Sequence, residues 1–155
     1  MAALAQPIPN EMWNILRRLF LTRSGADKTD RRAQGLWGEL QAERELKKKG
    51  YSILGRRIRV PPRDEIDLLA RDNQTLVFVE VKTRSREDFG RPGDAVNRSK
   101  RHFLSRAAVR YMMKLREKPD SFRFDVVEII GTEPAPPKAV RHIENAFPLE
   151  RSYRV

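Results

Sequence analysis

The amino-acid sequence predicts an α/β sandwich in which helices pack against a mixed β-sheet. The hydrophobic pattern changes along the chain in the order helix, three strands, helix, strand. The second of these helices is long enough to be the crossover that joins two parallel strands. With 155 residues, of which 39% are hydrophobic, the chain can form one compact core.

The N-terminal segment is predicted to be an arm that carries one short amphipathic helix. Apolar residues recur there at spacings of three and four, namely at Met12, Ile15, Leu16, Leu19 and Phe20. We expect this stripe to pack on the core or on a second copy of the chain, which would make a homodimer. The predicted division is an arm at 1–34, a main domain at 35–147 and a C-terminal tail at 148–155.

A further helix is predicted over residues 31–49, with Asp30 as its N-cap and Gly50 at its C-terminal end. Three β-forming runs follow, and we expect them to pair as an antiparallel meander. The predicted strands span residues 51–60, 65–70 and 75–82.

The clearest helix is predicted over residues 95–118, because its apolar side chains fall on one face and Pro119 follows. A fourth strand is predicted over residues 122–130. A Pro-rich loop then leads to a fifth strand, over residues 139–147, which we place at the edge of the sheet.

The charge balance indicates a polyanionic partner. Lys and Arg number 32 against 21 Asp and Glu, which gives a net charge of +11. Because the chain has no Cys and only two His, a metal would have to be held by oxygen ligands. No apolar run approaches the roughly 20 residues that cross a bilayer, and residues 1–9 lack the basic start of a secretory signal. We therefore expect a cytoplasmic protein without a membrane partner.

The strand predicted over residues 75–82 is almost entirely apolar, but it ends in an acid and a base. Alternation along a strand places Glu80 and Lys82 on the same face. An acid-x-Lys triplet is expected roughly once by chance, so an ordinary ion pair between these two residues is an alternative. Glu45 and Lys47 form a second triplet, but in a predicted helix, where side chains two residues apart diverge.

Two further acids are predicted to lie near Glu80. A turn at 72–74 pairs two strands and brings Asp67 within about two residues of the position opposite Glu80. Two carboxylates suit a hard cation such as Mg²⁺ or Mn²⁺. Glu39, on the apolar side of its helix, is the third candidate ligand, although a surface acid is an equal alternative there.

Glu39, Asp67 and the run Glu80-Val81-Lys82 together resemble the PD-(D/E)xK nuclease signature. A closer resemblance is to the YraN-type bacterial proteins, which are predicted endonucleases similar to archaeal Holliday-junction resolvases. It rests on residues 35–40, 65–68, 77–84, 95–96, Lys100, 124–127 and 145–147. The resemblance implies a restriction-endonuclease-like fold for the main domain. It also implies that the catalytic residues are Glu39, Asp67, Glu80 and Lys82, with the three carboxylates as metal ligands.

Two positions depart from that family. Asp64 stands where the family commonly has Gly, and the run Arg57-Ile58-Arg59 stands where Asn-x-Arg is common. Asp125 lies inside a matching segment, and we expect it to be structural, as a cap or in a pair with an Arg.

A nucleic-acid contact is predicted on the helix at 95–118. Basic residues and His102 recur there at every fourth position, and no acid occurs between Arg98 and Arg116. A stripe of one sign is self-repulsive unless a polyanion meets it, although a solvated basic face is the ordinary alternative. The predicted contacts are Arg98, Lys100, Arg106, Arg110 and Lys114. For Lys100 the alternative is a lysine whose stem packs on the apolar face.

The expected activity is metal-dependent hydrolysis of DNA phosphodiester bonds, with branched or damaged DNA as candidate substrates and Mg²⁺ or Mn²⁺ as cofactor. One alternative is a nucleic-acid-binding protein that retains the nuclease fold without turnover. A third interpretation is a structural adaptor that uses the N-terminal helix.

Overall fold

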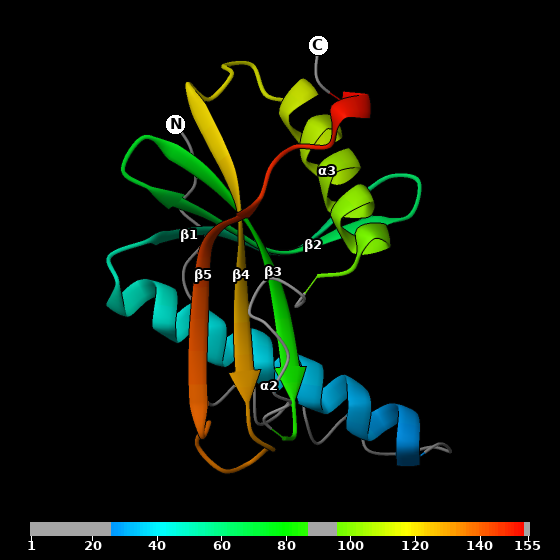
Figure 1. Cartoon of the computed structure of the whole chain (residues 1–155), viewed down its shortest axis with the longest axis vertical. Coiled ribbons are helices and arrows are strands. Elements are labelled where there is room, and N and C mark those ends of the chain that lie inside the picture. Colours follow the sequence, from blue (N-terminus) through cyan, green and yellow to red (C-terminus); the bar gives the residue numbers. More distant parts are fainter. Residues whose placement is uncertain (1–25, 87–95, 154–155) are drawn as a thin grey trace. The chain divides into compact units, whose positions relative to one another are not determined.

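The computed structural model describes residues 26–86 and 96–153 (Figure 1). Its elements are α2 (Ala26–Lys48), β1 (Ser52–Val60), β2 (Asp64–Asp72), β3 (Thr75–Arg84), α3 (Arg98–Met113), β4 (Ser121–Ile130), β5 (Ala139–Phe147) and the 3₁₀ helix η2 (Arg151–Tyr153). Residues from Gln34 onward form one compact unit. The amphipathic helix predicted between Met12 and Phe20 lies outside the described residues. None of the described helices is long and apolar enough to cross a membrane.

The five strands form one mixed sheet in the order β1-β2-β3-β4-β5. The first three strands pair antiparallel, as the predicted meander requires. β3 and β4 are parallel, and α3 is the crossover between them. β5 pairs antiparallel with β4 and is an edge strand. The predicted mixed α/β fold is therefore confirmed.

The two helices cover opposite faces of this sheet. One apolar cluster joins α3 to the sheet through Leu104, Ala107, Ala108, Phe78 and Phe124. A second joins α2 to the sheet through Trp37, Ala42, Leu46, Val79 and Val127. Because side chains alternate along a strand, Glu80 lies on the same face of β3 as Phe78 and is directed toward α3.

α2 begins at Ala26, so the prediction that Asp30 caps a helix starting at residue 31 is wrong. No Gly or Pro stands between these two positions, and nothing in the local sequence stops the helix from extending. The C-terminal end is as predicted. Gly50 adopts φ +90° and closes the last turn with the paired hydrogen bonds of a Schellman motif.

α3 is shorter than the predicted range of 95–118. Its N-cap is Asn97, whose side-chain oxygen accepts the backbone N–H of Lys100 at 2.9 Å. It ends at Met113, with Lys114 as its C-cap, so Pro119 is not the residue that stops it. The ammonium of Lys118 donates to backbone carbonyls at this end of the helix.

Candidate active site

The first pair of predicted site residues lies where β2 separates from β3. The two strands stay in register up to the pair Leu68 and Val79, and one further step places Asp67 opposite Glu80. There, Oδ2 of Asp67 accepts the backbone N–H of Val81 at 2.9 Å. The carboxylate thus takes a hydrogen bond that a backbone carbonyl of β2 would otherwise accept.

Burial and mutual repulsion define the electrostatics of this pair. Glu80 is only 6% exposed. The pKa of Asp67 is raised to about 6, first by burial and next by the charge of Glu80. Two carboxylates that are both removed from water are stabilised by any cation that reaches them.

The cation that contacts Glu80 is Lys100, in the first turn of α3. Its Nζ lies 3.1 Å from Oε1 of Glu80, and the two side chains are 51% and 8% exposed, respectively. Burial alone would lower the pKa of Lys100, but the charge and the hydrogen bond of Glu80 raise it above its usual value. The ammonium is therefore charged at neutral pH.

Lys82 lies two residues beyond Glu80 on the same strand and is half-buried. It has no hydrogen-bond or ion-pair partner within residues 26–86 and 96–153. The alternative in which Glu80 and Lys82 form an ordinary ion pair is therefore wrong. The partner of Glu80 comes from α3 instead, and Lys82 keeps its donors available.

Glu39, the third predicted ligand, comes from α2. Its side chain is 17% exposed, and Oε1 lies 3.7 Å from Nη1 of Arg57. The pKa of Glu39 is raised to about 7, first by burial, which Arg57 offsets in part, and then by the charges of Asp67 and Glu65. Glu39 therefore shares the electrostatic environment of Asp67 and titrates near neutral pH.

A close approach of α2 to β3 positions Glu39. A Cβ atom at Gly38 would lie 1.8 Å from Oγ1 of Thr83 and 3.0 Å from its Cβ, so a residue with a side chain does not fit without rearrangement. Sequence inspection missed this role. The available signal was a glycine inside a predicted helix, directly before a candidate acid.

The structure brings the predicted metal ligands together only in part. In the described part of the chain, no group of three or more His, Cys, Asp or Glu side chains is arranged to hold a metal ion. Asp67 and Glu80 meet, whereas Glu39 is paired with Arg57. The donor chemistry of the meeting pair still fits a hard divalent cation, because such an ion would offset the repulsion between a buried and a partly buried carboxylate.

Arg57 is one of the two departures from the family pattern. It adopts φ +45°, a left-handed conformation that Asn tolerates better than Arg. Its guanidinium lies 3.1 Å from Glu65 as well as 3.7 Å from Glu39. A strained backbone position therefore presents a cation between two acids at the edge of the candidate site.

Asp64, the other departure, forms a bidentate ion pair with Arg106 of α3, at 2.6 and 2.8 Å. Arg110 lies 3.5 Å from the same carboxylate, and His102 lies 2.9 Å from Glu150. Acids from β2 and from the C-terminal segment therefore meet the stripe on α3 at these positions, although no acid occurs within the helix itself.

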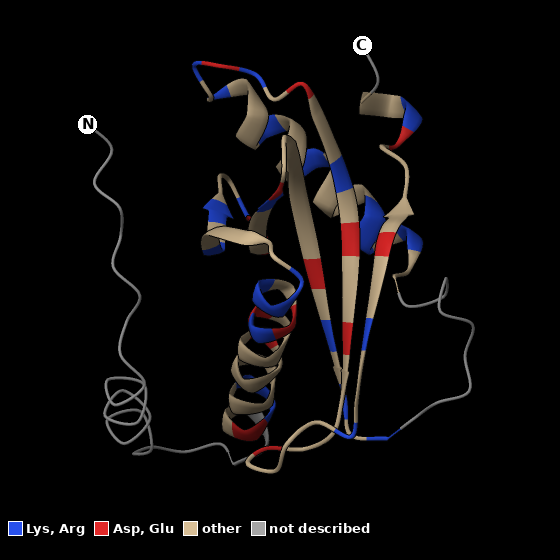
Figure 2. Ribbon diagram, turned by 90° about the vertical axis from the view of Figure 1, so that its left-hand side faces the viewer, with Lys and Arg blue, Asp and Glu red and all other residues tan. Residues whose placement is uncertain are grey.

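Basic and acidic residues are unevenly distributed over the molecule (Figure 2). Acidic segments lie midway along the strands, and the long helix α2 carries both basic and acidic segments. On α3, Arg98 is exposed, and so is Lys114 at the C-cap; neither has an ion-pair partner among the described residues. The predicted nucleic-acid contact at these two residues stays a prediction.

Comparison with known proteins identifies the family. The model of the uncharacterised protein family UPF0102 matches residues 38–129. A UPF0102 protein of Symbiobacterium thermophilum is 44% identical over 118 residues, which cover 75% of this chain and 97% of the relative. Another, from Desulfosudis oleivorans, is 41% identical over 117 residues, which cover 76% and 91%. The chain belongs to the UPF0102 family.

The UPF0102 match begins at Gly38 and contains all the predicted catalytic residues. UPF0102 is the family of the YraN-type proteins, so the family resemblance seen in the sequence is confirmed. The two departures at Arg57 and Asp64 also lie inside the match, and both are engaged in ion pairs beside the candidate site.

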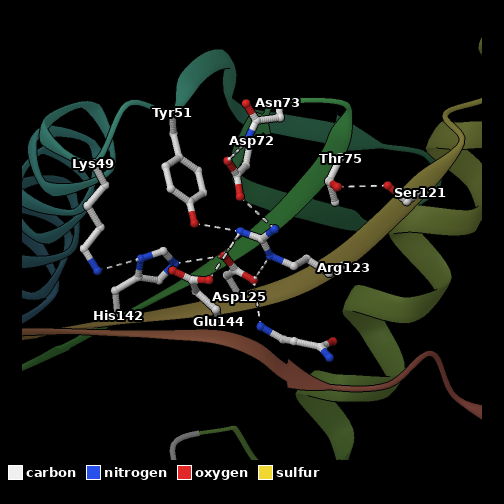
Figure 3. Close-up of polar contacts among 11 residues, drawn as sticks. Lys49, Tyr51, Asp72, Asn73, Thr75, Ser121, Arg123, Asp125, His142 and Glu144 are labelled. Carbon is white, nitrogen blue, oxygen red and sulfur yellow. Dashed lines mark hydrogen bonds and ion pairs between the residues drawn. The ribbon is translucent and has the colours of Figure 1, made fainter.

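A second polar cluster of this UPF0102 protein lies on the opposite face of the sheet (Figure 3). Asp125 is fully buried and accepts hydrogen bonds from Nε of Arg123 at 2.9 Å, Nε2 of His142 at 2.8 Å and the N–H of Asn145 at 3.0 Å. Its position on β4 places it on the α2 face, whereas Glu80 faces α3. As expected from the sequence, Asp125 pairs with an Arg and lies outside the candidate site.

Proposed function

We propose that this UPF0102 protein is a metal-dependent endonuclease that hydrolyses phosphodiester bonds of DNA. The observation that supports this most is the meeting of partly buried Asp67 on β2 with buried Glu80 on β3, the strand that also carries Lys82, unpaired among the described residues. Lys100 offsets the charge of Glu80, but Asp67 beside it has no side-chain cation in contact among the described residues, and carboxylate oxygens are the ligands of hard divalent ions. The net charge of +11 favours a polyanionic substrate.

Asp67 and Glu80 would hold Mg²⁺ or Mn²⁺, with Glu39 as the third acid. A bound ion supplies charge stabilisation at the phosphate and a water of lowered pKa. Asp67, with a pKa of about 6, is mostly ionised at neutral pH. Lys82 has donors free to orient a water or to offset negative charge on the phosphate. Glu39, with a pKa of about 7, can take up or release a proton near neutral pH.

The test is a nuclease assay with the purified full chain on duplex, single-stranded and branched DNA. We expect cleavage in Mg²⁺ or Mn²⁺ and none in EDTA. Asp67→Asn should abolish cleavage because it removes a ligand charge, and Lys82→Ala should abolish it while divalent ions still bind. Asp120→Asn is the matched control, since Asp120 is exposed and lies outside the site.

Two results would contradict the proposal. One is that the wild type cuts none of these substrates in either ion. The other is that cleavage persists unchanged in Asp67→Asn, which would assign the activity to a contaminating nuclease.

A second candidate function, nucleic-acid binding without turnover, is favoured by the ion pair between Lys100 and Glu80. This pair already neutralises the buried carboxylate of Glu80 without a metal. In that case DNA binding would be the same in Mg²⁺ and in EDTA, and Asp67→Asn would change the thermal stability alone.

A further inference from the structure

The carboxylate of Glu80 is neutralised by a side chain that is able to leave it. Glu80 is almost completely buried, so its charge needs a nearby cation. Lys100 supplies that cation at 3.1 Å, yet its own side chain is 51% exposed. The ammonium can therefore move into water without disturbing the apolar core.

The backbone of Lys100 is held in the first turn of α3, whereas its ammonium is held by the single ion pair with Glu80. Its N–H is capped by Asn97 at 2.9 Å, which anchors the first turn of α3. The part of the chain that the structure describes gives its ammonium no partner other than Glu80. Breaking one ion pair is thus enough to release the side chain from β3.

A divalent cation at Asp67 and Glu80 would have to compete with Lys100. If the ammonium and a metal ion were both bound to the carboxylate of Glu80, they would lie close together. Two cations at that distance repel each other strongly, above all in a partly buried site. Lys82 is not the competitor, because it forms no hydrogen bond or ion pair with Glu80.

We propose that Lys100 is a displaceable counter-ion of the Asp67–Glu80 pair, which a divalent cation releases to contact a phosphate group of the nucleic acid. This inference rests on the proposed function and deepens it. Because linkage is reciprocal, the cation and the nucleic acid then each increase the affinity for the other. The site is neutralised by its own chain until both ligands are present.

The first experiment measures Mn²⁺ binding by electron paramagnetic resonance, without nucleic acid. We expect Lys100→Met to bind Mn²⁺ about tenfold more tightly than the wild type, because the competing charge is gone. Lys100→Arg should stay close to the wild type, since it keeps a cation there. Lys114→Met, which removes an exposed lysine at the far end of α3, should not change the affinity.

The second experiment measures DNA binding with and without Ca²⁺, an ion with the same preference for oxygen ligands. The wild type should bind DNA several-fold more tightly in Ca²⁺, and Lys100→Met should lose this increase while it remains folded by circular dichroism. In a protein that carries Glu80→Gln, adding Lys100→Met should no longer change the affinity for Mn²⁺, because Lys100 then has no carboxylate at residue 80 to pair with.

The outcomes separate the inference from the proposed function. If the wild type binds Mn²⁺ and folded Lys100→Met binds it equally or more weakly, the inference is overturned and the nuclease proposal stands. If neither protein binds Mn²⁺, both are overturned. If only Lys100→Met binds it, Lys100 is confirmed as a competitor.

Discussion

Nε2 of His142 lies 2.8 Å from Oδ2 of Asp125, and both side chains are fully buried. On its other side, the ring Nδ1 lies 3.2 Å from Nζ of Lys49. Because an ammonium only donates, we assign Nδ1 as the acceptor and Nε2–H as the donor to Asp125. Arg123 extends the network to the hydroxyl of Tyr51 at 2.7 Å. The cluster thus ties β4 and β5 to the chain between α2 and β1.

Asp125→Ala should therefore be strongly destabilising. It leaves buried donors of Arg123 and His142 without this acceptor, while Arg123 keeps its ion pair with Asp72 at 3.0 Å, and unsatisfied buried donors cost about 1–3 kcal/mol each. The free energy of unfolding from urea titration measures the effect. Asp120→Ala, at an exposed position, should stay within about 0.5 kcal/mol of the wild type. A loss below about 1 kcal/mol for Asp125→Ala would show that the network is not structural.

The free energy of unfolding should fall as the pH rises from about 4.5 to about 7. In the folded protein the pKa of Glu39 is raised to about 7 and that of Asp67 to about 6, both first by burial. Between the unfolded and the folded pKa the folded state binds more protons, so a higher pH favours unfolding. Glu39→Gln should remove on the order of 1–2 kcal/mol of this decline.

Urea titrations at pH 4.5 and pH 7.5 measure this decline, and Glu45→Gln on the same helix is the control. Asp64 and Asp125 do not confound the comparison. Hydrogen bonds from Arg106 lower the pKa of Asp64. For Asp125, hydrogen bonds outweigh burial and also lower the pKa. Their stabilisation is present above the unfolded pKa of about 4 and is lost only below it. A decline that is equally steep in Glu39→Gln would contradict the assignment.

Gly38→Ala should destabilise the protein and displace Glu39. The new methyl group would meet Oγ1 of Thr83 at 1.8 Å, and overpacking of this kind costs about 1–3 kcal/mol. Adding Thr83→Ala should recover part of the loss, because the hydroxyl is removed while the Cβ contact at 3.0 Å remains. Gly35→Ala is the matched control on α2.

No atom lies within 4 Å of a Cβ built at Gly35, so Gly35→Ala should stabilise the helix by about 0.5–1 kcal/mol. Thermal and urea unfolding of Gly38→Ala, of the double variant with Thr83→Ala and of Gly35→Ala measure these effects. Equal behaviour of Gly38→Ala and Gly35→Ala would show that α2 does not approach β3 as closely as described.

Local sequence patterns were sufficient to predict the order of helices and strands and the proximity of Asp67 to Glu80. The apolar run that ends at Glu80 predicted β3, and the hairpin register predicted its neighbour Asp67. Both inferences depend on residues close in sequence, where periodicity and turn length determine the geometry. Gly50 at the end of α2 was predictable for the same reason.

Partners from distant elements were not predictable in this way. Glu80 pairs with Lys100 of the crossover helix, and Arg106 of that helix pairs with Asp64 on β2. A charge pattern along one helix does not include acids that the fold brings from another strand. The same limit explains why Gly38 was missed, since its role depends on contact with Thr83.

The exposed cations of α3, rather than Arg106, should contribute to DNA binding. Arg98 and Lys114 are exposed and unpaired among the described residues, whereas Arg106 donates twice to Asp64. The double variant Arg98→Gln/Lys114→Gln should reduce the slope of log K against log salt by about 1.8, at about 0.9 per phosphate contact. Its urea midpoint should not change.

Arg106→Gln should give the reverse pattern in the same two measurements. Without its partner, Asp64 is a buried carboxylate with only the longer contact to Arg110, so the urea midpoint should fall. The salt slope should remain that of the wild type, because the guanidinium of Arg106 is already committed to Asp64 in the free protein. The opposite result would be a reduced slope in Arg106→Gln and an unchanged slope in the double variant. It would show that DNA contacts Arg106 and that Arg98 and Lys114 do not contribute to binding.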